Sequence, residues 1–218
     1  MYKSIKNYSK KLKSIQITNP NKWSELHSKI KGIMIVGSTC SGKSTIVNQI
    51  RNSLKKVKVP KRIITRPQRL NDNLIENTFR TKDEFQKMIT NHEIGLNWTR
   101  KMEGKREEQY GFEIVAKEKF AVYSGNNALY NNKESVRPKE LLENHLYVGI
   151  YAPDKIRKER LLERSPDMKT EEVSYRLNDK SENILEHCHI IVNNFDSYQK
   201  NSGKELMDLI NFLQNNFE

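Results

Sequence analysis

The sequence is poor in cysteine and contains no long apolar run. Its 218 residues include two cysteines, Cys40 and Cys188, which lie far apart in the chain. Two such residues form neither a disulfide framework nor a cysteine-rich metal site, and their scarcity is typical of a reducing compartment. No stretch approaches the roughly 20 apolar residues of a membrane-spanning helix, and the first residues lack the apolar core of a secretory signal. We therefore expect a cytoplasmic protein without a membrane span.

Acidic residues are scarce near the start of the chain. Overall, 39 Lys and Arg residues stand against 27 Asp and Glu residues, which gives a formal net charge of +12. Such a surface attracts anions. We predict that residues 1–30 form a basic N-terminal extension, either solvated or weakly helical. We expect a small phosphorylated molecule as the partner and a monomer or homodimer, and the extension leaves a nucleic-acid contact open. Five lysines lie in the first fifteen residues, which contain no acidic residue: Lys3, Lys6, Lys10, Lys11 and Lys13.

Residues 37–44 form a complete phosphate-binding loop, G-x-x-x-x-G-K-[ST]. Residues 33–36 before it are apolar, as a buried strand requires, and the apolar positions after it fall on one helical face. The glycines let successive amide N–H groups point at the β-phosphate, Lys43 reaches the β/γ oxygens, and the Ser44 hydroxyl can ligate Mg²⁺. The sequence therefore predicts ATP and Mg²⁺ as cofactors. The predicted cofactor-binding residues of this loop are Gly37, Ser38, Thr39, Cys40, Ser41, Gly42, Lys43, Ser44 and Thr45.

Strand patterns alternate with helical patterns along the chain. The strands are expected at residues 33–36, 62–65, 120–123, 146–151 and 189–192, with helices between most of them and one more at the end. This order predicts an α/β P-loop NTPase three-layer fold with a mostly parallel sheet, formed by residues 31–218. The section at about 66–119 is predicted to be an inserted lobe. An arginine cluster at about 157–176 is interpreted either as a lid over phosphates or as a solvated helix face.

Two arginines, Arg66 and Arg69, lie in a T-R-P-x-R element just past a strand, so both can reach one phosphate. This element, the phosphate-binding loop, Trp98, Tyr110-Gly111, the arginine cluster and Val192-Asn193-Asn194 occur in the order of the guanylate kinase-like family. Residues 31–215 therefore resemble that family. The resemblance implies an acceptor held by Arg66, Arg69 and Tyr110, adenine near Asn193, a lid carrying Arg160, Arg164 and Arg176, and catalytic roles for Lys43, Arg164 and Arg176.

The sequence departs from guanylate kinases where those enzymes read their acceptor. Glu76-Asn77 replaces an Asp-Tyr pair, Asn97 replaces the carboxylate before the tryptophan, and the strand at 120–123 is followed by Ser124-Gly125 without acids. Losing a designed hydrogen bond to a base lowers base selectivity. In these respects the chain is similar to the ribose 1,5-bisphosphate phosphokinases, which make phosphoribosyl pyrophosphate. Asn77 and Asn97 are accordingly predicted to bind the acceptor.

Three functions remain open. The first is an ATP-dependent kinase for ribose 1,5-bisphosphate. The second is a guanylate or other nucleoside monophosphate kinase with relocated base contacts, for which Glu103, Glu107 and Glu108 are candidates. The third is a non-catalytic nucleotide-binding module, against which the intact Lys43 and Ser44 argue.

Overall fold

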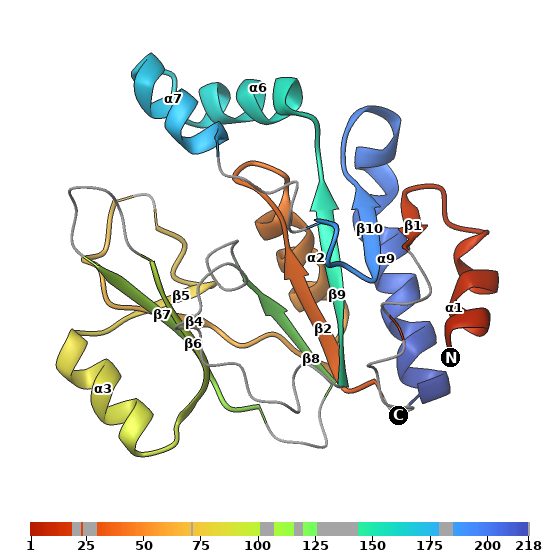
Figure 1. The fold of residues 1–218 in the computed structure, drawn as a ribbon, viewed down its shortest axis with the longest axis horizontal. Coiled ribbons are helices and arrows are strands. Elements are labelled where there is room, and N and C mark those ends of the chain that lie inside the picture. Colours follow the sequence, from red (N-terminus) through yellow and green to blue (C-terminus); the bar gives the residue numbers. More distant parts are fainter. Residues whose placement is uncertain are drawn as a thin grey trace.

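A six-stranded sheet lies at the centre of the fold (Figure 1). The computed structural model describes residues 1–18, 23, 30–70, 72–100, 107–115, 120–125, 144–178 and 185–217. The strand order is β1-β10-β9-β2-β8-β3, and all neighbours are parallel except β1 with β10. The mostly parallel sheet of the predicted α/β fold is therefore confirmed. The strands are β1 (Ile15–Ile17), β2 (Gly32–Val36), β3 (Val57–Lys58), β8 (Phe120–Ser124), β9 (His145–Tyr151) and β10 (Ile190–Asn193).

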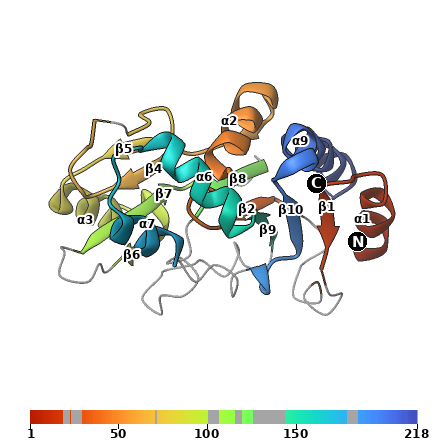
Figure 2. The same ribbon diagram turned by 90° about the horizontal axis from the view of Figure 1, so that it is seen from above.

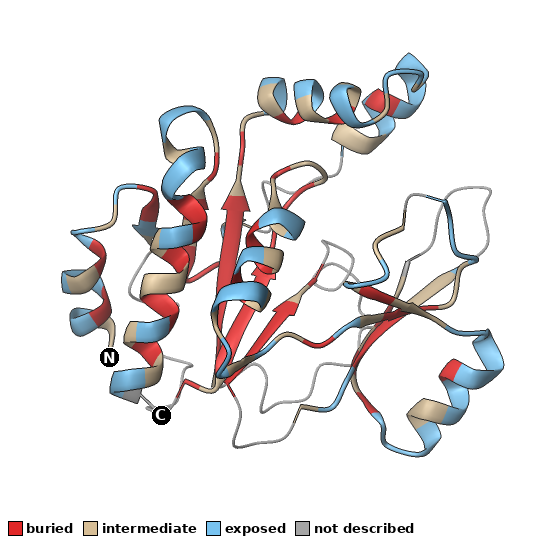
Figure 3. Ribbon diagram, turned by 180° about the vertical axis from the view of Figure 1, so that it is seen from behind, coloured by how far each residue is buried: buried red, intermediate tan, exposed pale blue. Residues whose placement is uncertain are grey.

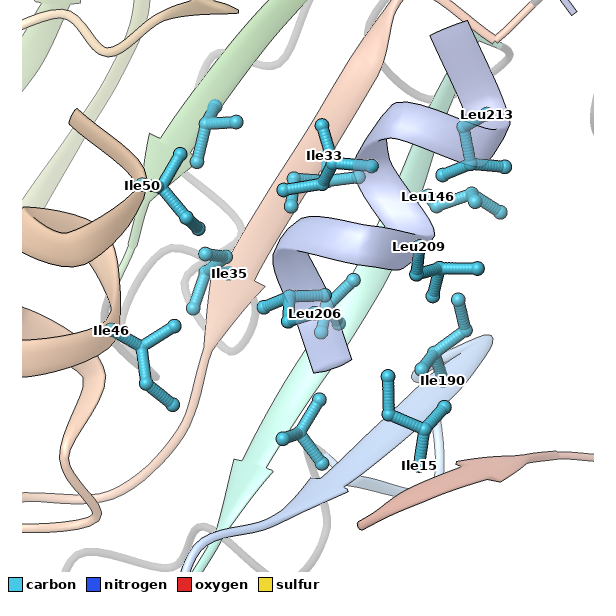
Figure 4. Packing of buried hydrophobic residues seen from close by; sticks show 14 of the residues in the cluster. Ile15, Ile33, Ile35, Ile46, Ile50, Leu146, Ile190, Leu206, Leu209 and Leu213 are labelled. Atoms are coloured by element: carbon cyan, nitrogen blue, oxygen red, sulfur yellow. The ribbon is translucent and has the colours of Figure 1, made fainter. Parts of the chain in front are cut away.

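Two helices, α2 (Lys43–Ser53) and α9 (Asp196–Phe217), cover one face of this sheet (Figure 3). Alternate residues of β2, Ile33 and Ile35, point toward them, because successive side chains of a strand face opposite ways. Each fully buried Leu or Ile side chain of this kind contributes about 1.5–3 kcal/mol to folding. The cluster in Figure 4 includes Ile33, Ile35, Ile46, Ile50, Leu146, Ile190, Leu206, Leu209 and Leu213.

The other face of the sheet packs against a separate four-stranded lobe. Met34 and Val36 of β2 share a buried cluster with lobe residues that include Trp98 and Phe112. The lobe sheet has the order β5-β4-β7-β6 and is backed by α3 (Lys82–Thr90). Thr81 and Glu84, which have the sequence spacing of a capping box, begin α3 and satisfy each other's backbone N–H groups. The lobe strands are β4 (Arg62–Ile64), β5 (Asn77–Phe79), β6 (Ile94–Arg100) and β7 (Glu108–Glu113).

One predicted strand belongs to a different sheet from the one expected. Residues 62–65 were expected in the main sheet, but β4 pairs with β5 and β7 of the lobe. The short strand β3, which the sequence pattern did not indicate, takes the edge position next to β8 instead. Ile63 and Ile64 of β4 are both buried, one against α3 and one toward the main sheet, so apolar content alone fits either sheet.

Two further helices, α6 (Asp154–Arg164) and α7 (Thr170–Leu177), lie beyond the carboxyl end of β9. The front and top views place α6 over the loop between β2 and α2 (Figures 1 and 2). These helices contain the arginine cluster at 157–176. None of the helices in the described ranges has both the length and the apolar character needed to cross a bilayer.

The first 18 residues are integrated into the domain rather than forming a tail. Helix α1 (Tyr2–Ser9) buries Ile5 completely, and the Tyr8 ring stacks on Phe212 of α9 with centroids 4.2 Å apart. Strand β1 then pairs antiparallel with β10. The alternative of a solvated extension is therefore wrong for this segment, because its few apolar residues all face the sheet and α9, whereas the helical alternative is found as α1. All five of its lysines remain exposed.

Replacing Ile5 with Ala is expected to lower the free energy of unfolding by about 2–5 kcal/mol, because the removed side chain leaves a cavity under α1. Denaturation by urea measures this loss. The matched control is Lys6→Ala on the exposed face of the same helix, with an expected change within about 0.5 kcal/mol. Equal effects of the two substitutions would contradict the docking of α1.

A buried histidine makes stability depend on pH. His145 begins β9, is 7% exposed, and neither ring nitrogen has a hydrogen-bond partner among the described residues. Burial, assisted by the charge of Lys31, lowers the pKa of His145 from 6.5 to about 4. The unfolded chain therefore binds a proton that the folded chain rejects, and stability present above pH 6.5 is lost as the pH falls toward 4.

The expected loss between these limits reaches about 3 kcal/mol. Urea denaturation at a series of pH values measures it. His145→Phe, which keeps a ring and removes the titration, should flatten this part of the profile, whereas His92→Gln at an exposed position should leave it intact. A profile that His145→Phe does not change would refute the assignment.

Candidate nucleotide and acceptor site

The phosphate-binding loop has the backbone geometry that its sequence predicts. Gly37, Cys40 and Gly42 have φ angles of 149°, 61° and 97°. Gly42 precedes the first residue of α2, and a Cβ atom there would lie 2.0 Å from the Asn194 Nδ2 atom. Only glycine fits such a close approach at a positive φ. The loop therefore curls tightly onto the start of α2, which places helix N–H groups at its centre.

Lys43 and Ser44 lie in the first turn of α2, as predicted. The Lys43 ammonium donates hydrogen bonds to the carbonyl oxygens of Gly37 and Ser38, the latter at 2.7 Å. It therefore lies across the mouth of the loop. Ser44 and Thr45 are exposed, and the first turn of α2 contains no acidic residue that would repel an anion.

A pocket of about 730 Å³ opens beside this loop. It lies where the starts of α2 and α9 meet α6. Seven predicted residues line it: Cys40, Gly42, Lys43, Ser44, Thr45, Arg160 and Arg164. The residues that line it without having been predicted include Gln49, Asn194, Asp196, Gln199, Lys200 and Ser202.

Asn194 rather than Asn193 reaches this pocket. Asn194 is 5% exposed, donates to the Ser41 carbonyl at 2.7 Å and accepts from the Ser202 hydroxyl at 2.8 Å. Asn193 belongs to β10, and its backbone N–H donates to the Ser14 carbonyl. The inward alternation of Ile190 and Val192 was the signal that would have selected Asn194 over its neighbour.

The three arginines of α6 have different positions. Arg157 is buried and donates to the carbonyls of Thr39 and Leu177, so it connects α6 with the phosphate-binding loop and with α7. Arg160 donates to the Asn194 carbonyl at 2.7 Å and to the carbonyls of Cys40 and Ser41 at 3.3 and 3.4 Å. Arg164 lines the pocket.

Arg176 differs from these three arginines because it pairs along α7. Its Nη2 atom lies 2.6 Å from Glu172 Oε1, one helical turn away. It is not among the described residues that line the pocket. The structure thus brings Arg160 and Arg164 to the phosphate-binding loop but not Arg176.

The two predicted acceptor arginines lie close together at one end of the lobe, and each meets a carboxylate. Arg66 forms a two-point ion pair with Asp72, at 2.7 and 2.6 Å. Arg69 lies 3.7 Å from Glu108, which also accepts a hydrogen bond from the Tyr110 hydroxyl. We call these five residues, Arg66, Arg69, Asp72, Glu108 and Tyr110, the acceptor cradle. Asp72 was not predicted, because sequence spacing does not reveal which carboxylate a loop folds onto an arginine.

The two predicted asparagines have different surroundings. Asn77 is buried, and its side-chain oxygen accepts two hydrogen bonds from Arg62, at 3.1 and 2.9 Å. It therefore holds Arg62, whose pKa is lowered by burial. Asn97 pairs with Gly111, whereas the next residue, Trp98, pairs with Tyr110. Since successive residues of a strand face opposite ways, Asn97 lies on the other face of the lobe sheet from Tyr110.

Trp98 is a packing residue. It is 1% exposed and stacks on the Tyr110 ring with centroids 5.5 Å apart. The buried Trp98 ring thus holds the Tyr110 ring in place. Glu76, the residue before β5, accepts a hydrogen bond from Asn48 of α2 at 2.8 Å, which ties the lobe to the helix that begins at Lys43.

A metal ion would find few protein ligands here. No cluster of three or more His, Cys, Asp or Glu side chains suited to a metal occurs in the described ranges. Ser44 is exposed at the phosphate-binding loop, so its hydroxyl fits a cation that takes most of its ligands from phosphate oxygens and water.

Comparison with known proteins supports the fold. No family model and no curated protein matches the sequence. Solved structures do match: guanylate kinase from Anaplasma phagocytophilum aligns over 89% of this chain and 89% of its own, at 19% identity and a TM-score of 0.51. The chain therefore has a guanylate kinase-like fold. The fold resemblance predicted from the sequence is confirmed, and at this level of identity it defines the architecture alone.

Proposed function

We propose that the chain is an ATP-dependent phosphotransferase that acts on a small phosphorylated acceptor. The observation that supports this most directly is the pairing of two anion sites on one fold. A complete phosphate-binding loop presents Lys43 and Ser44 beside a pocket, and the acceptor cradle presents Arg66 and Arg69 on the lobe. Glu76 and Asn48 connect the two.

The residues of the loop fit a nucleoside triphosphate and its magnesium ion. The positive φ angles turn loop N–H groups inward, the Gly42 position admits no side chain, and Ser44 is exposed to serve as a ligand. Bound Mg²⁺ would supply charge neutralisation between the phosphates. Arg160 and Arg164 would bind the triphosphate from the side of α6, and Lys43 would leave its loop carbonyls for phosphate oxygens.

The chemistry demands alignment and charge stabilisation rather than a covalent nucleophile. An oxygen of the acceptor phosphate forms a bond to the terminal phosphorus of ATP, the bond from that phosphorus to the bridging oxygen breaks, and ADP leaves. A phosphate oxygen is already ionised near neutral pH, so this step needs no general base. The task of the chain is to hold two anions together, for which Lys43, Arg66 and Arg69 supply positive charge.

Ribose 1,5-bisphosphate is the acceptor that we favour, with phosphoribosyl pyrophosphate as product. Asn77 occupies the position of the missing tyrosine and is committed to Arg62, and β8 ends at Ser124 without a carboxylate. An acceptor without a base requires neither a second phosphate tyrosine nor a base-reading acid on that strand. The two free cysteines, Cys40 and Cys188, agree with our proposal that it acts in the cytoplasm.

One observation favours GMP instead. The Glu108 side chain is 13% exposed and lies in the acceptor cradle, where a carboxylate could accept hydrogen bonds from the guanine edge. A relocated base contact was one of the alternatives that the sequence left open. Glu107 is described beside it, whereas Glu103 lies outside the described residues.

A screen with Mg-ATP and five acceptors tests the proposal: ribose 1,5-bisphosphate, GMP, dGMP, AMP and UMP. Turnover confined to ribose 1,5-bisphosphate is the expected result. Turnover of GMP alone would select the second candidate. Binding of Mg-ATP without phosphorylation of any acceptor would reject the kinase and leave a nucleotide-binding module.

A further inference from the structure

We propose that Asp72 is a positioning residue for the acceptor phosphate, acting through Arg66. Asp72 holds the guanidinium by its two terminal nitrogens and thereby turns its remaining edge toward the acceptor. This role rests on the proposed function, because it assumes that Arg66 binds the acceptor. It assigns a task to a carboxylate that would otherwise repel a phosphate.

The hydrogen bonds of Arg66 show which edge of its guanidinium remains for a ligand. A guanidinium carries five N–H donors. One Nη1–H bonds to Asp72 Oδ2 at 2.7 Å, one Nη2–H bonds to Asp72 Oδ1 at 2.6 Å, and Nη1 also donates to the Pro67 carbonyl at 2.9 Å. The Nε–H and the second Nη2–H have no acceptor among the described residues. These two donors lie on one edge and form the fork that binds two phosphate oxygens.

Burial and two further contacts fix the pair in place. Both side chains of the Arg66–Asp72 pair are 12% exposed. Asp72 Oδ2 also accepts the backbone N–H of Arg69 at 2.6 Å, so Asp72 is anchored by its own loop. The Arg66 guanidinium lies 5.4 Å from the centroid of the Phe79 ring, which supports its plane.

The ion pair stays charged over the working pH range. The hydrogen bond from Arg66 lowers the pKa of Asp72, and the same bond raises the pKa of Arg66. By contrast, the Arg69 side chain is 59% exposed and lies 3.7 Å from Glu108. The acceptor cradle thus contains one arginine whose orientation is fixed by a two-point ion pair and one whose side chain is mostly exposed.

The opposite role for Asp72 is that of a competing anion, which occupies Arg66 until the acceptor displaces it. The two roles predict opposite signs. If Asp72 competes, neutralising it raises the affinity for the acceptor; if it positions Arg66, neutralising it lowers that affinity. The anchoring of Asp72 by the Arg69 N–H favours positioning, because a displaced Asp72 would have to break that bond as well.

The test compares Asp72→Asn, Asp72→Glu and the wild-type chain. Steady-state kinetics with the acceptor that the wild type phosphorylates gives KM for that acceptor, KM for ATP and kcat. Asp72→Asn is expected to raise the acceptor KM by about tenfold to a hundredfold and to leave the ATP KM within about twofold. Asp72→Glu, which keeps the carboxylate, is expected to recover most of the affinity. Asp83→Asn, which neutralises an exposed carboxylate on α3, is the matched control and should change neither constant.

Calorimetric titration with ribose 1,5-bisphosphate and with GMP separates failure of this role from failure of the proposed function. Wild-type binding without phosphorylation would reject the kinase, and the affinity of Asp72→Asn would still decide the role of Asp72. An unchanged or lower acceptor KM or Kd in Asp72→Asn overturns the proposal. So does an equal loss of ATP and acceptor affinity, loss of the folded state in both Asp72 variants, or absence of acceptor binding by the wild type.

Discussion

Lys43→Ala is expected to lower the rate of ATP-dependent phosphorylation by about a hundredfold to a thousandfold. The Lys43 ammonium is held at the mouth of the phosphate-binding loop by the carbonyls of Gly37 and Ser38, where a triphosphate would replace those carbonyls as its partner. Removing it takes away a charge that stabilises the transferring phosphoryl group more than the bound substrate. The assay is the rate of ADP formation with the best acceptor of the screen.

The matched control for this experiment is Lys55→Ala, which removes an exposed lysine from the turn after α2. It should retain full activity, and circular dichroism of both variants should match that of the wild type. A Lys43→Ala variant that phosphorylates the acceptor at the normal rate would rule out the proposed donor site.

Gly42→Ala should abolish measurable Mg-ATP binding and lower the free energy of unfolding by about 1–3 kcal/mol. The φ angle of 97° is unfavourable for a residue with a side chain, and the new Cβ atom would lie 2.0 Å from Asn194 Nδ2. Asn194 would have to move, which breaks its hydrogen bond to the Ser41 carbonyl. Calorimetry measures ATP binding, and urea denaturation measures stability.

Ser202→Ala serves as the comparison for Gly42→Ala. It removes the Ser202 hydroxyl that donates to Asn194 and leaves the loop backbone unchanged, at an expected cost of about 1 kcal/mol. It should weaken ATP binding far less than Gly42→Ala does. Comparable ATP affinities in the two variants would mean that the tight turn at Gly42 is not what shapes the site.

The parts of the fold that the sequence predicted well are those set by local pattern. The phosphate-binding loop, the helix after it and the capping box of α3 each depend on residues within a few positions of one another. The strand at 62–65 was identified, but its sheet was not. Ile63 and Ile64 point to opposite faces of the strand and both are buried, so their apolar character fits either sheet. Which sheet a strand joins is decided by its pairing with strands elsewhere in the sequence, here β5 and β7.

The candidate site shows the same division. The spacing of Arg66 and Arg69 correctly places them together, yet Asp72 and Glu108, their partners, follow from the path of a loop and a strand. Likewise, the sequence did not reveal that Asn77 accepts hydrogen bonds from Arg62 or that Asn97 lies on the face of the lobe sheet away from Tyr110. Polar residue types show that an interaction is needed, but only the folded chain determines with which group.

The pairing of β1 with β10 joins segments that lie far apart in the sequence. Ser14 bonds to Glu205, 191 residues later, and Tyr8 stacks on Phe212. During synthesis, residues 1–18 can therefore dock only after β10 and α9 have been made. Contacts between such remote segments slow folding, because closing a long loop comes before any gain from the contact. The exposed lysines of α1 favour the solubility of this segment before it docks.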